Sequence, residues 1–180
     1  MKSAIVTLVL AALMPALPGQ VREIDAANSK AAFSVSHIWV EHVTGRVPIL
    51  SGNVVLPPGS LIPVRANAVL AAAAVVTGDP DRDRSLKSPD FFDARQFPTW
   101  TFTSTSVTAK GSSAFEMMGD LTIHGVTQQE VLNVSVGGTI AHPTYHATTH
   151  IDRHAFGMTV TRLDPTIGAT VDVTLDVALK

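Results

Sequence analysis

Hydrophobic and polar residues alternate along most of the chain after residue 20. The clearest run lies at the C-terminus, where aliphatic residues alternate with Asp, Thr and Ala: Val171, Val173, Leu175, Val177 and Leu179. Successive side chains of a β-strand point to opposite faces, so this run predicts a half-buried strand. Similar runs at residues 33–37, 99–103 and 132–136, rich in Val, Thr and Ser, predict further strands.

Turn residues separate these runs at near-regular intervals. His124-Gly125 lies between the runs 116–123 and 126–136, and an X-Gly pair there favours a two-residue turn with positive φ. Further turn signals stand at Gly45, Pro57-Pro58-Gly59, Lys110-Gly111, Gly137-Gly138 and Asp164-Pro165. Many short strands at such spacing predict an all-β sandwich or barrel in a single domain.

One segment, residues 79–98, breaks the alternation. It is charged at its start and contains Phe91, Phe92 and Phe97. We expect a short helical or irregular insertion that packs these aromatic side chains over one end of a barrel. Its carboxylates lie beside Arg and Lys residues, so ion pairing and helix capping explain them better than acid–base catalysis.

The first 20 residues predict a signal peptide. Lys2 supplies a positive charge, and residues 4–17 are almost wholly apolar. This run is shorter than the ~20 residues that span a bilayer, and a basic start before it is typical of secretory signals. We therefore expect residues 1–20 to be removed. The domain at residues 21–180 would then be exported without a transmembrane anchor.

Composition excludes several classes of protein. The chain has no cysteine, which excludes disulfide scaffolds and thiol chemistry. Its formal net charge of -2 leaves no basic surplus for a phosphate backbone, so we expect no nucleic-acid partner. Hydrophobic residues make up 46% of the chain and charged residues 16%, which supports a folded core rather than a disordered chain.

Histidines are the clearest candidates for polar chemistry. His146, His150 and His154 are spaced by four residues, which on a strand separates neighbours by about 13 Å, too far for one metal ion. A solvated polar face explains them best, with a metal site or a pH sensor as alternatives. His37 continues the face of Phe33 and Val35, so we expect it to point inward, as a core histidine or a ligand contact.

No sequence pattern supports catalysis. The chain contains no G-x-S-x-G, P-loop or G-x-G-x-x-G motif, and we expect no enzymatic activity, no cofactor and no metal. What remains is a barrel with an apolar interior, and an antiparallel barrel of about eight strands can hold an apolar ligand. A packed core explains the same composition, so a ligand cavity and a filled barrel both stay open.

Four blocks, in order along the chain, carry a family resemblance. They are residues 23–47 with the F-x-V-x-H run, 75–107 with Asp90-Phe91-Phe92-Asp93, GDLTIHGVT at 119–127, and Arg153 with Phe156-Gly157. Together they resemble the YceI-like family of polyisoprenoid-binding, lipocalin-like proteins. The chain departs from that family at Asn28 and Ser85, where His is common, and at Ala155, where Asp is common.

The resemblance implies an extended eight-stranded antiparallel barrel with a long apolar cavity, capped by residues 80–98. It implies a polyprenyl ligand, either a polyprenyl phosphate or an isoprenoid quinone, export to the bacterial periplasm and, often, a homodimer. The residues expected at the ligand are Phe33, Val35, His37, Phe91, Phe92, Trp100 and Phe102. Arg82 and Asp83 would pair to hold the capping segment. The alternative is a stress-response or protein-interaction barrel that is filled by its own side chains and takes no lipid.

Overall fold

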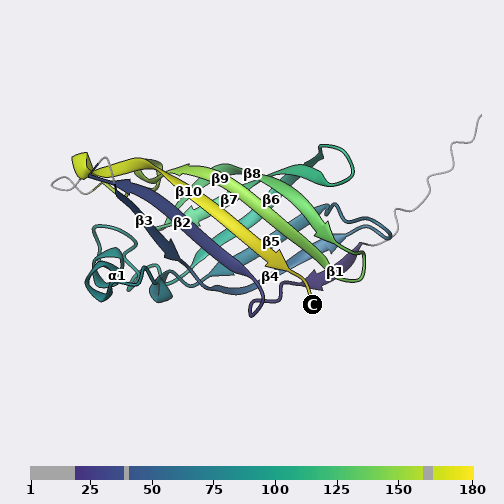
Figure 1. The fold of residues 1–180 in the computed structure, drawn as a ribbon, viewed down its shortest axis with the longest axis horizontal. Helices are drawn as coiled ribbons and strands as arrows, with labels where there is room; N and C mark the ends of the chain where they lie inside the picture. Colours follow the sequence, from purple (N-terminus) through teal and green to yellow (C-terminus); the bar gives the residue numbers. More distant parts are fainter. Residues whose placement is uncertain (1–18, 39–40, 160–163) are drawn as a thin grey trace, which may run out of the picture.

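The computed structural model describes residues 19–38, 41–159 and 164–180. Its strands are β1 (Gln20–Glu23), β2 (Lys30–His37), β3 (Glu41–Arg46), β4 (Ile49–Leu56), β5 (Arg65–Leu70), β6 (Trp100–Ala109), β7 (Ala114–Ile123), β8 (Val126–Gly138), β9 (Pro143–Asp152) and β10 (Ile167–Ala178). They form one sheet in the order β1-β4-β5-β6-β7-β8-β9-β10-β2-β3. The sheet curls about its long axis (Figure 1), which confirms the predicted all-β, barrel-like fold.

The sheet curls into a barrel because β3 and β4 are two halves of one bent segment. β3 pairs with β2, whereas β4, after residues 47–48, pairs with β5 and β1. Isolated bridges join further backbone segments, Arg46 to Val76 and Ile24 to Leu179. The strand count is therefore ten rather than the expected eight, since the bend divides one strand and β1 adds a short one at the edge.

The predicted strands and the predicted turn are confirmed. The alternating runs of the sequence lie in β2, β6, β8 and β10. His124 and Gly125 connect β7 to β8 with φ angles of 53° and 73°. Two successive positive φ angles are those of a type I′ turn, whose twist matches that of the flanking strands.

The capping segment contains the one α-helix of the described residues, α1 (Pro80–Leu86), followed by turns. Figure 1 shows α1 at one end of the barrel, away from β1 and the C-terminus. Phe97 packs edge-on against His124 of the β7–β8 turn, with 5.5 Å between ring centroids. The expected helical or irregular insertion over a barrel end is confirmed.

Three 3-10 helices complete the described fold: η1 (Ala72–Ala74), η2 (Arg153–Phe156) and η3 (Asp164–Thr166). The apolar core has two parts. One contains Ile24 and Leu179, near the chain ends, together with Phe102, Phe115 and Leu132. The other gathers near the capping segment, around Val75, Phe92, Phe156 and Met158. The inward faces of the strands supply most of the first part, whereas turns and the 3-10 helix η2 supply most of the second.

No helix among the described residues is long and apolar enough to cross a membrane. The predicted signal peptide lies outside the described residues, apart from its last two positions. β1 begins at Gln20, the final residue of that range.

Candidate ligand cavity

A cavity of about 220 Å³ lies inside the barrel. Eight strands line it, all except the two edge strands β1 and β3, and Leu86 of α1 closes part of it. The lining is almost entirely aliphatic or aromatic, and its ionisable members are Glu130, Tyr145 and Arg153. For comparison, an apolar cavity of ~150 Å³ holds benzene, and sites for drug-sized ligands begin near ~300 Å³. The cavity therefore suits an apolar group or one section of a chain.

Six of the seven residues expected at the ligand line this cavity: Phe33, Val35, Phe91, Phe92, Trp100 and Phe102. They come from β2 and, much later in the sequence, from the capping segment and from β6, which follows it directly. Strand alternation places the β2 and β6 side chains inward, and the turns after α1 bring in the remaining two. Their contact with a ligand stays a prediction.

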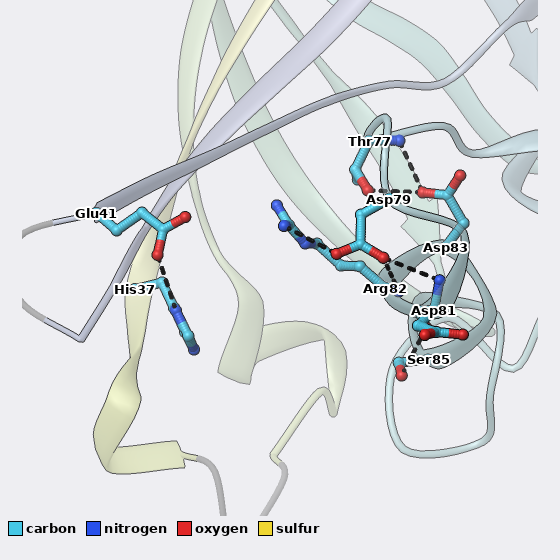
Figure 2. Close-up of polar contacts among 8 residues, drawn as sticks. All are labelled: His37, Glu41, Thr77, Asp79, Asp81, Arg82, Asp83 and Ser85. Atoms are coloured by element: carbon cyan, nitrogen blue, oxygen red, sulfur yellow. Dashed lines mark hydrogen bonds and ion pairs between the residues drawn. The ribbon is translucent and has the colours of Figure 1, made fainter.

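The structure places His37 outside the cavity lining. It is the last residue of β2, and its Nδ1 lies 3.9 Å from a carboxylate oxygen of Glu41 at the start of β3 (Figure 2). Its side chain is 34% exposed. A role of His37 at the ligand also stays a prediction.

Two glycines make room for aromatic rings of the lining. Gly45 stands opposite Phe33 in the β2–β3 register, and a Cβ at Gly45 would overlap the Phe33 ring. A Cβ at Gly119 would likewise overlap the ring of Phe102. Because glycine has no side chain, each ring lies directly against the backbone of its neighbouring strand. These pairs explain two glycines of the family-like blocks by packing alone.

Trp100 carries a polar group without a partner. Its Nε1–H is buried and makes no hydrogen bond within the described part of the chain. Phe92, from the capping segment, covers the indole edge-on with ring centroids 4.7 Å apart. A buried donor left unpaired costs about 1–3 kcal/mol. Phe92 of the capping segment thus covers a wall residue, Trp100, whose indole N–H has no acceptor within the described residues.

Arg153 and Tyr145 use their polar atoms to hold the walls together. The Arg153 side chain is almost fully buried and donates to the carbonyl oxygens of Met158, Ile167 and Gly168. The Tyr145 hydroxyl donates to the carbonyl of Leu61 at 3.0 Å and so holds the β4–β5 loop. Burial raises the pKa of Tyr145 to about 12, so the phenol keeps its proton.

Glu130 is the functional candidate that the sequence analysis missed. It lies half-buried on β8 and lines the cavity. Burial raises the pKa of its carboxyl. The signal was present in the sequence, because Glu130 has the same strand parity as the inward-facing Leu132 and Val134.

The capping segment is held by hydrogen bonds that Figure 2 shows around α1. Asp79 is the N-cap, and its carboxylate accepts from the backbone N–H groups of Asp81 and Arg82. These bonds lower the pKa of Asp79. The expected Arg82–Asp83 pair is wrong: Arg82 lies 3.4 Å from Asp79, and Asp83 accepts from both N–H and Oγ1 of Thr77 at 2.7 Å.

The spaced histidines lie on the outside of the barrel. His146 and His150 are exposed on β9 and pair across to Asp176 and Asp172 of β10, at 2.8 and 2.6 Å. The expected solvated strand face is confirmed for these two. His154 belongs to η2, after the strand has ended, so it does not share that face. Within the described ranges no group of three His, Cys, Asp or Glu residues could hold a metal ion.

Comparison with known proteins agrees with the family resemblance. The model of the YceI-like domain matches residues 23–179. A UPF0312 protein of Vibrio vulnificus (strain YJ016) is 35% identical over 123 residues, which span 65% of this chain and 65% of that relative. A UPF0312 protein of Vibrio cholerae serotype O1 (strain M66-2) is 28% identical over 172 residues, covering 89% of this chain and 90% of the relative.

Solved structures share the fold. BcnA of Burkholderia cenocepacia matches with a TM-score of 0.80 at 21% identity, over 87% of this chain and 99% of that one. A polyisoprenoid binding domain from Saccharophagus degradans, implicated in plant cell wall breakdown, matches with a TM-score of 0.71 at 20% identity, over 88% and 97%. At such identities these structures support the fold. Because the domain family matches nearly the whole of the described chain, the protein belongs to the YceI-like family.

Proposed function

We propose that this protein is an exported, non-enzymatic carrier that holds an isoprenoid lipid in its barrel cavity. The observation that carries the proposal is the apolar cavity itself, which eight strands and the capping segment line. An isoprenoid tail is insoluble in water, and its burial contributes about 25 cal/mol per Å² of apolar area. A carrier of this kind needs shape and apolar surface rather than a catalytic group.

The lipid that we propose is a polyprenyl phosphate or an isoprenoid quinone in the bacterial periplasm. A solved relative in fold is named as a polyisoprenoid binding domain, which supports this ligand class. The cavity volume of about 220 Å³ suits one section of such a chain. A longer section would have to displace side chains at the capped end, where Phe91 and Phe92 line the cavity.

The test is a polar substitution at the capped end of the cavity. Phe91 is only partly buried, so Phe91→Ser should leave the fold intact while it removes apolar contact with the ligand. We expect about tenfold weaker binding of a polyprenol or an isoprenoid quinone, since that factor corresponds to ~1.4 kcal/mol of lost burial. Displacement of a fluorescent apolar probe measures the affinity.

Val131→Ser provides the matched control. Val131 is 39% exposed, so it too is an apolar residue made polar. It lies on β8 but is not part of the cavity lining. Unchanged lipid affinity in a folded Phe91→Ser protein, or an equal loss in both variants, would contradict the proposed site.

A further inference from the structure

Glu130 places a carboxyl group inside a largely apolar wall. Its neighbours on the inward face of β8, Leu132 and Val134, are buried core residues. Across the β7–β8 ladder it stands opposite Gly119, against whose backbone the Phe102 ring of the cavity wall lies. The carboxyl therefore belongs to the surface that a bound ligand would contact.

Nothing in the described parts of the chain pairs with this carboxyl. The cation of the lining, Arg153, donates to the carbonyl oxygens of the wall. The third ionisable lining residue, Tyr145, belongs to the core cluster near the chain ends and donates to Leu61. Burial is accordingly the cause that raises the pKa of Glu130.

An unpaired acid in such a place discriminates between ligand head groups. A carboxylate taken out of water is costly until a donor or a cation pairs with it. An ammonium group supplies both, because charge-assisted hydrogen bonds are about twice as strong as neutral ones. A hydroxyl supplies only a neutral donor. An anionic group adds a like charge, which disfavours ionisation of both groups.

We propose that Glu130 is a specificity-determining residue, which makes the cavity favour amphiphiles that carry a hydrogen-bond donor, amines above all, over anionic amphiphiles of equal chain length. The inference rests on the proposed function in one respect, that an apolar chain enters this cavity. It goes further by assigning a chemical class to the head group that reaches β8. A phosphate-bearing lipid would bind with its head group away from Glu130.

The experiment compares three ligands of one chain length: dodecylamine, dodecanol and dodecanoate. Each displaces a fluorescent apolar probe from the wild-type protein at pH 7, below the concentration at which micelles form. We expect the amine to bind about tenfold more tightly than the carboxylate, with the alcohol between them. In Glu130→Gln, which keeps the shape and removes the charge, the amine and the carboxylate should bind within about threefold of each other.

Glu116→Gln is the matched control, because Glu116 pairs with Lys110 and does not line the cavity. It should keep the wild-type order of affinities, since the overall charge changes equally in both variants. Equal binding of all three ligands by wild type, or an order that Glu130→Gln leaves unchanged, would overturn the inference while the carrier function stands. Failure of all three to bind would overturn the proposed function itself. The wild-type order of affinities tests the inference even where the variant does not fold.

Discussion

At the scale of single residues, the shape and the charge of the cavity depend on a few residues that are not large and apolar. Gly45 and Gly119 make room for the rings of Phe33 and Phe102. These rings therefore lie against the neighbouring strands and line the cavity instead of occupying it. Glu130 and Arg153 are exceptions in charge, and Glu130 is the acidic one. It introduces an ionisable group where packing alone would favour an aliphatic residue.

Glu130 should make the stability of the unliganded protein depend on pH. Burial raises its pKa above the ordinary value of 4.5, so the folded protein keeps this proton to higher pH than the unfolded chain does. As the pH rises above that value, the unfolded chain ionises first and stability falls, until the folded carboxyl has ionised as well. Glu130→Gln lacks this titration. The wild-type melting temperature minus that of Glu130→Gln should therefore be more positive at pH 4 than at pH 7.

Thermal melts followed by circular dichroism at both pH values measure this difference. Glu116→Gln serves as the comparison, because the Glu116 side chain is 43% exposed, lies outside the cavity and undergoes the same substitution. The same difference between wild type and Glu130→Gln at pH 4 and pH 7 would mean that Glu130 is solvated as fully as in the unfolded chain. Tyr145, whose pKa burial raises to about 12, does not titrate in this range.

Sequence reasoning located the wall residues better than their polar partners. Alternation predicts that Phe33 and Val35 share an inward face, and both line the cavity, because the face on which a strand residue lies is a local property of the chain. The predicted partner of Arg82, Asp83, is wrong because the pairing depends on helix geometry. Asp79 caps α1 and lies one helical turn before Arg82, so it is Asp79 that pairs with Arg82. Glu130 lies on the same strand face as Leu132 and Val134. It was still missed, since a charged residue is not expected on an inward face.

At the scale of elements, the capping segment begins with the short helix α1, which is fixed at its first turn. Thr77 binds Asp83 through backbone and side chain, and Asp79 caps the backbone N–H groups of Asp81 and Arg82. A helix of seven residues is too short to be stable by itself, so these bonds keep it in place, together with the packing of Phe91 and Phe92 from the turns that follow it.

Replacing the cap should loosen this segment selectively. In Asp79→Ala the backbone N–H groups of Asp81 and Arg82 lose their acceptor. We expect several-fold faster amide exchange over residues 80–86 and little change in the strands. Asp79→Asn is the control, because asparagine caps helices about as well as aspartate and should restore slow exchange. Exchange in Asp79→Ala as slow as in wild type would show that the cap does not hold α1.

The strands and the β7–β8 turn could be predicted from sequence because each depends on neighbouring residues. The bend between β3 and β4 could not, since the strand exchanges its partner β2 for β5 and β1 at residues 47–48. Partner choice is settled by contacts that are distant in sequence. The hydrogen bond from Tyr145 to Leu61, 84 residues away, is a further contact of this kind.

At the scale of the whole molecule, one sheet encloses a cavity that is lined by side chains of both core clusters. The cluster that contains Ile24 and Leu179 joins the chain ends, and the other packs beneath the capping segment around Phe92 and Phe156. This arrangement leaves apolar side chains facing a shared interior. A filled barrel would instead bring those side chains together, as protein cores are close-packed.

The most direct test of the carrier proposal is native mass spectrometry of the full chain, expressed for export and purified without detergent, followed by organic extraction. The proposal predicts an added mass on the folded protein, which the solvent releases as an isoprenoid lipid. A mass equal to that of the bare chain, unchanged after incubation with polyprenyl phosphates and isoprenoid quinones, would contradict it. That result would favour a barrel that acts through protein partners.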